Sequence, residues 1–77
     1  MRLDKFLKQT RLIKRRSVAK AMADAGRILK NGIPLKPSYD VKPGDELEIR
    51  FFSKRLLIRV TGDLEVEVLH AVKEDDV

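Results

Sequence analysis

Gly26 divides the chain into two parts with different hydrophobic periods, and this change limits the possible folds more than any other feature. Before Gly26, apolar residues recur every three to four positions, which is typical of amphipathic helices. After Gly26 they alternate with polar residues, which is typical of half-buried strands. The sequence therefore predicts an α+β domain in which two packed N-terminal helices precede a small, mostly antiparallel sheet.

Two short helices are expected in the first part. A helix over residues 3–10 is predicted by the apolar face of Leu3, Phe6 and Leu7. Asp4 would lie in its first turn, as a helix-start or salt-bridge residue. A second helix is predicted over residues 15–25. Its apolar stripe, which would face the core, consists of Val18, Ala21, Met22 and Ala25. Gly26 would end this helix, and its alanines would allow the first helix to approach closely.

The second part of the chain predicts a hairpin followed by three strands. Asn31-Gly32 joins the hairpin arms 27–30 and 33–35, and Pro34 restricts the second arm to a sheet edge. A loop over 36–42 and a turn at 43–45 follow. Three strands are then predicted by apolar residues that alternate with polar ones: Leu47, Ile49 and Phe51 in the first, Leu56, Ile58 and Val60 in the second, and Leu64, Val66 and Val68 in the third. Turns are expected at Ser53-Lys54 and over 61–63, and residues 73–77 are expected to fray.

The length and composition exclude most catalytic chemistry. A chain of 77 residues forms one domain with little room for a substrate cavity. It has no cysteine and one histidine, so thiolate zinc sites, thiol nucleophiles and histidine clusters are excluded. We therefore expect no enzyme, no cofactor, no metal and no small-molecule substrate. With no long apolar stretch and no signal-peptide pattern, we expect a cytoplasmic protein that does not enter a membrane.

Charge is distributed very unevenly. Residues 1–36 contain eleven Lys/Arg and two acids, a net charge of +9, whereas residues 37–77 contain six Lys/Arg and ten acids, a net charge of −4. A half-chain this basic predicts a polyanionic partner, most often nucleic acid. The acidic second part argues against a tail that binds any anion.

A cluster of cations carries this prediction. It consists of Arg2, Lys5, Lys8, Arg11, Lys14, Arg15 and Arg16. Scattered lysines are equally well explained as a solvated face, but Lys14, Arg15 and Arg16 lie at a helix start, where the dipole disfavours cations. A phosphate bound there would reverse that penalty. Lys20 extends the charge along the second helix.

Structured RNA fits this cluster better than duplex DNA. The second helix could be misread as the recognition helix of a small DNA-binding regulator, which remains a remote alternative. However, it carries no Asn or Gln to read base edges. Tyr39 could stack on a base, although packing against the helices is the preferred interpretation, and His70 is expected at the surface. Phe52 could cover a sheet edge, contact a partner or stack on a base.

Taken together, these motifs resemble the S4-type, or alpha-L, RNA-binding domain. The residues that carry the resemblance are Arg2-Leu3-Asp4-Lys5, Leu7, Arg11, Lys14-Arg15-Arg16-Ser17, Gly26-Arg27-Ile28, Asn31-Gly32, Lys36, Ser38 and 41–45. The resemblance implies an S4-type core over residues 1–50, with residues 51–77 as a strand extension and tail of the same domain. Lys30 stands where the family has an aliphatic residue, so either the hairpin register differs or Lys30 contacts RNA.

Within this family the chain is most similar to small ribosome-associated quality-control factors and heat-shock S4 proteins. The resemblance implies binding to large-subunit ribosomal RNA and peptidyl-tRNA, together with a partner factor that adds C-terminal tails to stalled nascent chains. A heat-shock-type role in recycling obstructed large subunits, or generic binding of structured RNA, is the alternative. The expected RNA-binding residues are Arg2 and Arg16 first, then Arg11, Lys14 and Arg15, with Lys8, Lys20 and Lys36.

Overall fold

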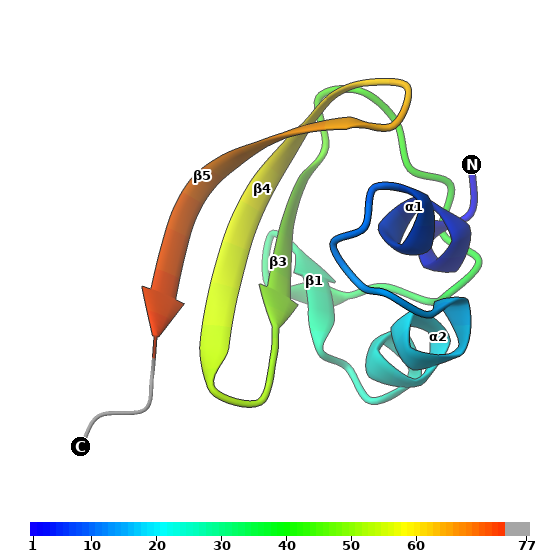
Figure 1. Ribbon diagram of the computed structural model, residues 1–77. Coiled ribbons are helices and arrows are strands. Elements are labelled where there is room, and N and C mark those ends of the chain that lie inside the picture. Colours follow the sequence, from blue (N-terminus) through cyan, green and yellow to red (C-terminus); the bar gives the residue numbers. More distant parts are fainter. Residues whose placement is uncertain (74–77) are drawn as a thin grey trace.

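The computed structural model describes residues 1–73, and they form two helices that cover one face of a five-stranded antiparallel sheet (Figure 1). The elements are α1 (Leu3–Gln9), α2 (Arg16–Asp24), β1 (Ile28–Lys30), β2 (Ile33–Pro34), β3 (Glu46–Arg50), β4 (Lys54–Gly62) and β5 (Glu65–Lys73). The predicted α+β class and the helices-first order are confirmed. No helix within residues 1–73 is long and apolar enough to cross a membrane.

The strand order is β2-β1-β3-β4-β5, so the first hairpin forms one edge of the sheet. Lys30 pairs with Ile33 around the turn, and Leu29 pairs with Pro34. Asn31 and Gly32 both have positive φ, at 53° and 79°, as a two-residue hairpin turn of the I′ type requires. Both the Asn-Gly turn and the edge position of Pro34 are confirmed.

The turn between β4 and β5 lies later in the chain than predicted. β4 continues through Gly62, and the connection is made by Asp63 and Leu64. Leu64 has φ 57° and is 41% exposed, so the expectation that it begins an inward-facing strand was wrong. The left-handed backbone at this second residue of the turn takes Leu64 out of the alternation. Residue 73 is part of β5 rather than frayed, and 74–77 lie outside the described residues.

Apolar residues from both layers form one core between the helices and the sheet. It contains Leu3, Phe6, Leu7, Ile13, Ala19, Ala23, Ile28, Val41, Leu47, Ile49, Ile58 and Val60. Of the predicted stripe of the second helix, only Met22 packs against the core; the rest of the prediction was wrong, because Ala19 and Ala23 are buried whereas Val18 is 44% exposed. Alanines occur on both candidate faces of α2. The face with Ala19 and Ala23 is buried because these small side chains let α1 and α2 approach closely.

Candidate nucleic-acid interface

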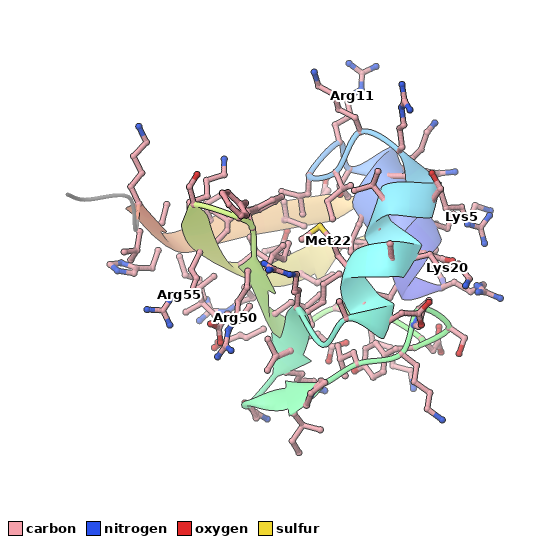
Figure 2. All side chains as sticks on the ribbon, turned by 90° about the horizontal axis from the view of Figure 1, so that it is seen from below. Lys5, Arg11, Lys20, Met22, Arg50 and Arg55 are labelled. Atoms are coloured by element: carbon pink, nitrogen blue, oxygen red, sulfur yellow. The ribbon has the colours of Figure 1, made fainter. Side chains whose placement is uncertain are left out.

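The eight cations predicted to bind RNA are all exposed. We call them the cation face: Arg2, Lys8, Arg11, Lys14, Arg15, Arg16, Lys20 and Lys36. Seven belong to α1, α2 or the residues beside them, and Lys36 lies in the loop between β2 and β3. Figure 2 shows Arg11 and Lys20 on the helical layer, together with Lys5. The helical layer thus carries seven cations of this face, from residues 2–20, and Lys36 comes from a separate loop.

A buried carboxylate joins the two arginines expected to matter most. Asp4 is 2% exposed and accepts hydrogen bonds from Arg2 Nε and Nη2, both at 3.2 Å. Arg16 Nη2 lies 3.4 Å from the same carboxylate. The Arg2 and Arg16 side chains nevertheless remain 51% and 49% exposed. Asp4 therefore fixes two guanidinium groups from different helices while leaving their remaining donors accessible to a ligand.

The electrostatics keep Asp4 ionised. Burial raises the pKa of this carboxyl, but hydrogen bonds from Arg2, from the Lys5 backbone N–H and from Arg16 more than offset the effect. The net result is a pKa below the ordinary aspartate value of 3.8. Asp4 is thus a salt-bridge residue, in agreement with the expectation, and its link to Arg16 across 12 positions was not predicted.

The loop after β2, which contains Lys36, packs along the start of α1. The Leu3 N–H donates to the Tyr39 carbonyl at 2.8 Å, and the Asp4 N–H donates to the Pro37 carbonyl at 3.1 Å. These bonds satisfy amides that a helix start leaves unpaired. The first turn of α1 is therefore fixed by the protein itself, and the charged side chains provide its ligand-binding donors.

The connection between α1 and α2 forms an open, basic hollow. Arg11 adopts a left-handed backbone with φ 63°, which reverses the chain after the last turn of α1. The resulting hollow measures about 550 Å³ and is lined by Lys8, Gln9, Arg11 and Lys14. Three cations around one concave surface suit a phosphate group better than any apolar ligand.

The start of α2 keeps its positive potential. Arg15 is the extended residue before the helix, no side chain caps this end, and the first turn contains no acid. At the other end of α2, Lys20 Nζ pairs with Asp24 Oδ2 at 3.3 Å. Both predicted cations within α2 therefore pair with an acid, Arg16 with the buried Asp4 and Lys20 with the exposed Asp24.

Lys30 has a structural role. Its Nζ donates to Asp45 Oδ1 at 2.8 Å and to the Tyr39 hydroxyl at 3.1 Å. Tyr39 in turn donates to Asp45 Oδ2 at 2.9 Å, and the Lys42 N–H donates to the same oxygen at 3.0 Å. The hairpin thus tolerates a lysine at an inward position because a carboxylate 15 residues later neutralises it. This arrangement also agrees with the preferred interpretation that Tyr39 packs within the domain.

Mutual pairing stabilises the charged forms of this cluster. Hydrogen bonds to Asp45 and Tyr39 raise the pKa of Lys30 well above its ordinary value, against an opposing effect of burial. Burial raises the pKa of Asp45, but the bonds from Lys30, the Lys42 N–H and Tyr39 hold it below 3.8 overall. Lys30 and Asp45 are therefore both charged across the physiological range.

The face of the sheet that points away from the helices has a different character. Arg59 lies between two acids, with Nη2 3.0 Å from Glu46 Oε2 and Nη1 3.4 Å from Glu67 Oε1. Within residues 1–73, no group of three or more His, Cys, Asp or Glu could hold a metal ion. Because Glu46 and Glu67 neutralise the charge of Arg59, this arginine is a poor candidate for RNA contact and a suitable control for the cation face.

Comparison with known proteins agrees with this architecture. The S4 domain model matches residues 1–47. The chain is 51% identical over 76 residues to the RQC P-site tRNA stabilizing factor of Streptococcus pneumoniae, covering 99% of this chain and 81% of the relative. It is 62% identical over 60 residues to the protein of that name in Bacillus subtilis, covering 78% of this chain and 70% of the relative.

A solved structure shares the fold. Heat Shock Protein 15 of Vibrio cholerae, described as trimeric, superposes with a TM-score of 0.78 at 28% identity, covering 88% of this chain and 80% of that chain. The predicted resemblance to S4-type proteins is thereby confirmed. The chain belongs to the S4 domain family, where it is similar to the RQC P-site tRNA stabilizing factors and to Heat Shock Protein 15.

Proposed function

We propose that this chain is an RNA-binding factor of ribosome-associated quality control with no catalytic activity of its own. In this proposal it binds, in the cytoplasm, the large ribosomal subunit that still holds peptidyl-tRNA. The cation face contacts ribosomal RNA and the tRNA in the P site. By holding the tRNA there, the chain supports a partner factor that extends the stalled nascent chain with a C-terminal tail.

The observation that carries the proposal is the pair of half-exposed guanidinium groups that Asp4 fixes at the junction of α1 and α2. Side chains that are already ordered lose less conformational entropy when they bind. Guanidinium groups also match the geometry of phosphate oxygens and can donate two hydrogen bonds at once. The names of the relatives point to the tRNA in the P site as the RNA whose position is stabilised.

The shape of the surface supports RNA over the other partners considered. α2 contains nine residues, and its exposed side chains include no Asn or Gln that could read base edges of duplex DNA. A broad face of cations without base-reading side chains suits recognition of an RNA backbone by its shape. The hollow beside Arg11 is open and lined by charged and amide side chains, which does not suit a small apolar substrate.

Tail synthesis on stalled subunits tests this function. Large subunits carrying peptidyl-tRNA are incubated with the tailing factor and charged tRNA, with or without this chain, and tail length is followed by gel electrophoresis. We expect the wild-type chain and the Arg59→Gln variant to increase tail synthesis several-fold. The Arg16→Gln variant should bind too weakly to increase tail synthesis appreciably. Arg59→Gln is the matched control because it removes the same charge from the far face of the sheet.

Equal tail synthesis with and without the chain would contradict the proposal. If the chain still bound the loaded subunits, a role in recycling obstructed subunits would then be favoured. The structural similarity to Heat Shock Protein 15 supports that second candidate.

A further inference from the structure

The loop between β3 and β4 exposes an aromatic ring that the fold does not use. β3 ends at Arg50 and β4 begins at Lys54, so the turn expected at Ser53-Lys54 lies one residue earlier. Phe51 packs against the core, whereas Phe52 is 96% exposed. The loop is closed by the Phe51 N–H, which donates to the Lys54 carbonyl at 2.8 Å. This backbone contact makes no use of the Phe52 side chain.

Cations surround this ring although the second part of the chain is acidic. The segment 50–55 contains Arg50, Lys54 and Arg55 and no acid. Arg27, directly before β1, donates from Nη1 to the Arg50 carbonyl at 3.0 Å, which fixes its guanidinium at the base of the hairpin. An open hollow of about 440 Å³ is lined by Arg27, Arg50, Phe51, Phe52 and Arg55.

Glu48 offsets part of this charge. Glu48 Oε2 lies 2.9 Å from Arg50 Nε and 3.7 Å from Arg55 Nη1. Glu48 thus pairs with two of the arginines, whereas Arg27 is held by the Arg50 carbonyl. Lys54 Nζ lies 5.0 Å from the centroid of the Phe51 ring, so the other aromatic of the loop already has a cation partner. Phe52 is the ring that this loop presents to a ligand.

This surface is separate from the cation face. Figure 2 shows Arg50 and Arg55 beside the sheet, on the opposite side of the molecule from Lys5 and Lys20. Met22 lies between the two regions in this view, and together with Arg27, Arg50, Phe51 and Phe52 it lines a second open hollow of about 340 Å³. A ligand at the hairpin tip would therefore be a different segment from the one bound by Arg2 and Arg16.

We infer that the β3–β4 hairpin tip is a second RNA contact, in which Phe52 stacks on an unpaired base while Arg27 and Arg50 bind the neighbouring phosphates. An exposed aromatic flanked by guanidinium groups is the usual way in which proteins bind unpaired nucleotides. One ring is enough to stack one base, but it is too small to form the apolar core of a protein interface. The inference rests on the proposed function in taking the RNA of the loaded large subunit as the ligand.

Two contacts on one small domain have a functional consequence. Once the cation face is bound, the hairpin tip searches only the RNA within its reach, so a weak stacking interaction adds strongly to the total affinity. The chain would thereby bind two RNA segments at once, and would discriminate a subunit that presents both from one that presents a single segment.

The absence of tryptophan from the sequence provides a direct readout. In the Phe52→Trp variant the introduced side chain is the sole tryptophan, and a stacked base quenches its fluorescence. We expect quenching by loaded large subunits and, at higher concentration, by a single-stranded oligoadenylate. We also expect Phe52→Ala to bind loaded subunits about tenfold more weakly than wild type, with an unchanged salt dependence because no charge is lost.

Two controls separate this inference from the proposed function. Ile33→Ala removes another exposed apolar side chain, 66% exposed on the edge strand β2, and should bind like wild type. Arg16→Gln reports on the cation face in the same assay. If Arg16→Gln binds weakly while Phe52→Ala binds like wild type, the hairpin contact is wrong and the proposed function stands.

The remaining combinations of binding and quenching results can also be interpreted. Weaker binding by Phe52→Ala without quenching by oligoadenylate would identify a protein contact at the hairpin tip and would overturn the inference. If the wild-type chain does not bind loaded subunits, the proposed function fails, and quenching by oligoadenylate still decides whether the ring stacks on bases. An absence of quenching by both probes would overturn the stacking contact outright.

Discussion

Replacing Arg2 and Arg16 together by glutamine is expected to weaken binding to loaded large subunits by about a hundredfold. Each arginine would lose a charge-assisted hydrogen bond to phosphate, which is worth about 1.5–3 kcal/mol, and tenfold in affinity corresponds to about 1.4 kcal/mol. Glutamine is chosen because its amide can still donate to Asp4, so the buried carboxylate is not left without partners. Affinity is measured by titration at several salt concentrations.

The salt dependence identifies the cause of the loss. Removing two phosphate contacts should lower the slope of log affinity against log salt by about 1.5–2. Arg59→Gln should leave both the affinity and the slope close to wild type, because Arg59 already lies between Glu46 and Glu67. If the double variant binds as tightly as Arg59→Gln and is folded by circular dichroism, the cation face is not the RNA-binding surface.

The second large effect is on stability. Asp45→Ala is expected to lower the free energy of unfolding by about 2–4 kcal/mol, because Asp45 is 8% exposed and accepts hydrogen bonds from Lys30, Tyr39 and the Lys42 N–H. For a domain of this size the midpoint of thermal unfolding should fall by roughly 10–20 °C. Thermal denaturation followed by circular dichroism measures the change.

An exposed acid provides the matched comparison. Asp63→Ala removes the same charge from the turn before β5 and should leave the midpoint nearly unchanged. The pairing that lowers the pKa of Asp45 stabilises the fold above pH 3.8, and this stability is lost as the pH falls through the lower folded value. Asp45→Ala should therefore lose less stability in acid than wild type does. Equal midpoints for the two variants would show that the Lys30–Asp45–Tyr39 cluster is not stabilising.

The fold was largely predictable because local signals agree with one another. The change of period at Gly26 placed both helices before the sheet, and Asn31-Gly32 fixed the first hairpin. The buried face of α2 was not predictable, since alanines occur at both candidate positions and packing against α1 chose between them. The turn at Leu64 was missed because a leucine gives no sign that it will adopt a left-handed backbone.

The site was predictable in composition but not in geometry. The sequence indicated which cations share the helical layer, and the roles of the individual residues in RNA binding remain predictions. The salt bridges of the site could not be predicted because their partners are far apart in sequence. Asp4 contacts Arg16, and Lys30 contacts Asp45, only after the chain has folded. For Phe52, three interpretations remained open at the level of sequence, and the exposure of the ring beside Arg27 and Arg50 favours base stacking.

Sedimentation through sucrose gradients tests the central claim most directly. The chain is mixed with large subunits that are empty or that carry peptidyl-tRNA, at low and at raised salt. Simultaneous contact with ribosomal RNA and tRNA predicts preferential binding to the loaded subunits, with binding to both weakening as salt increases. Equal binding to empty and loaded subunits would contradict recognition of the tRNA, and no binding to either would contradict the proposed role at the ribosome.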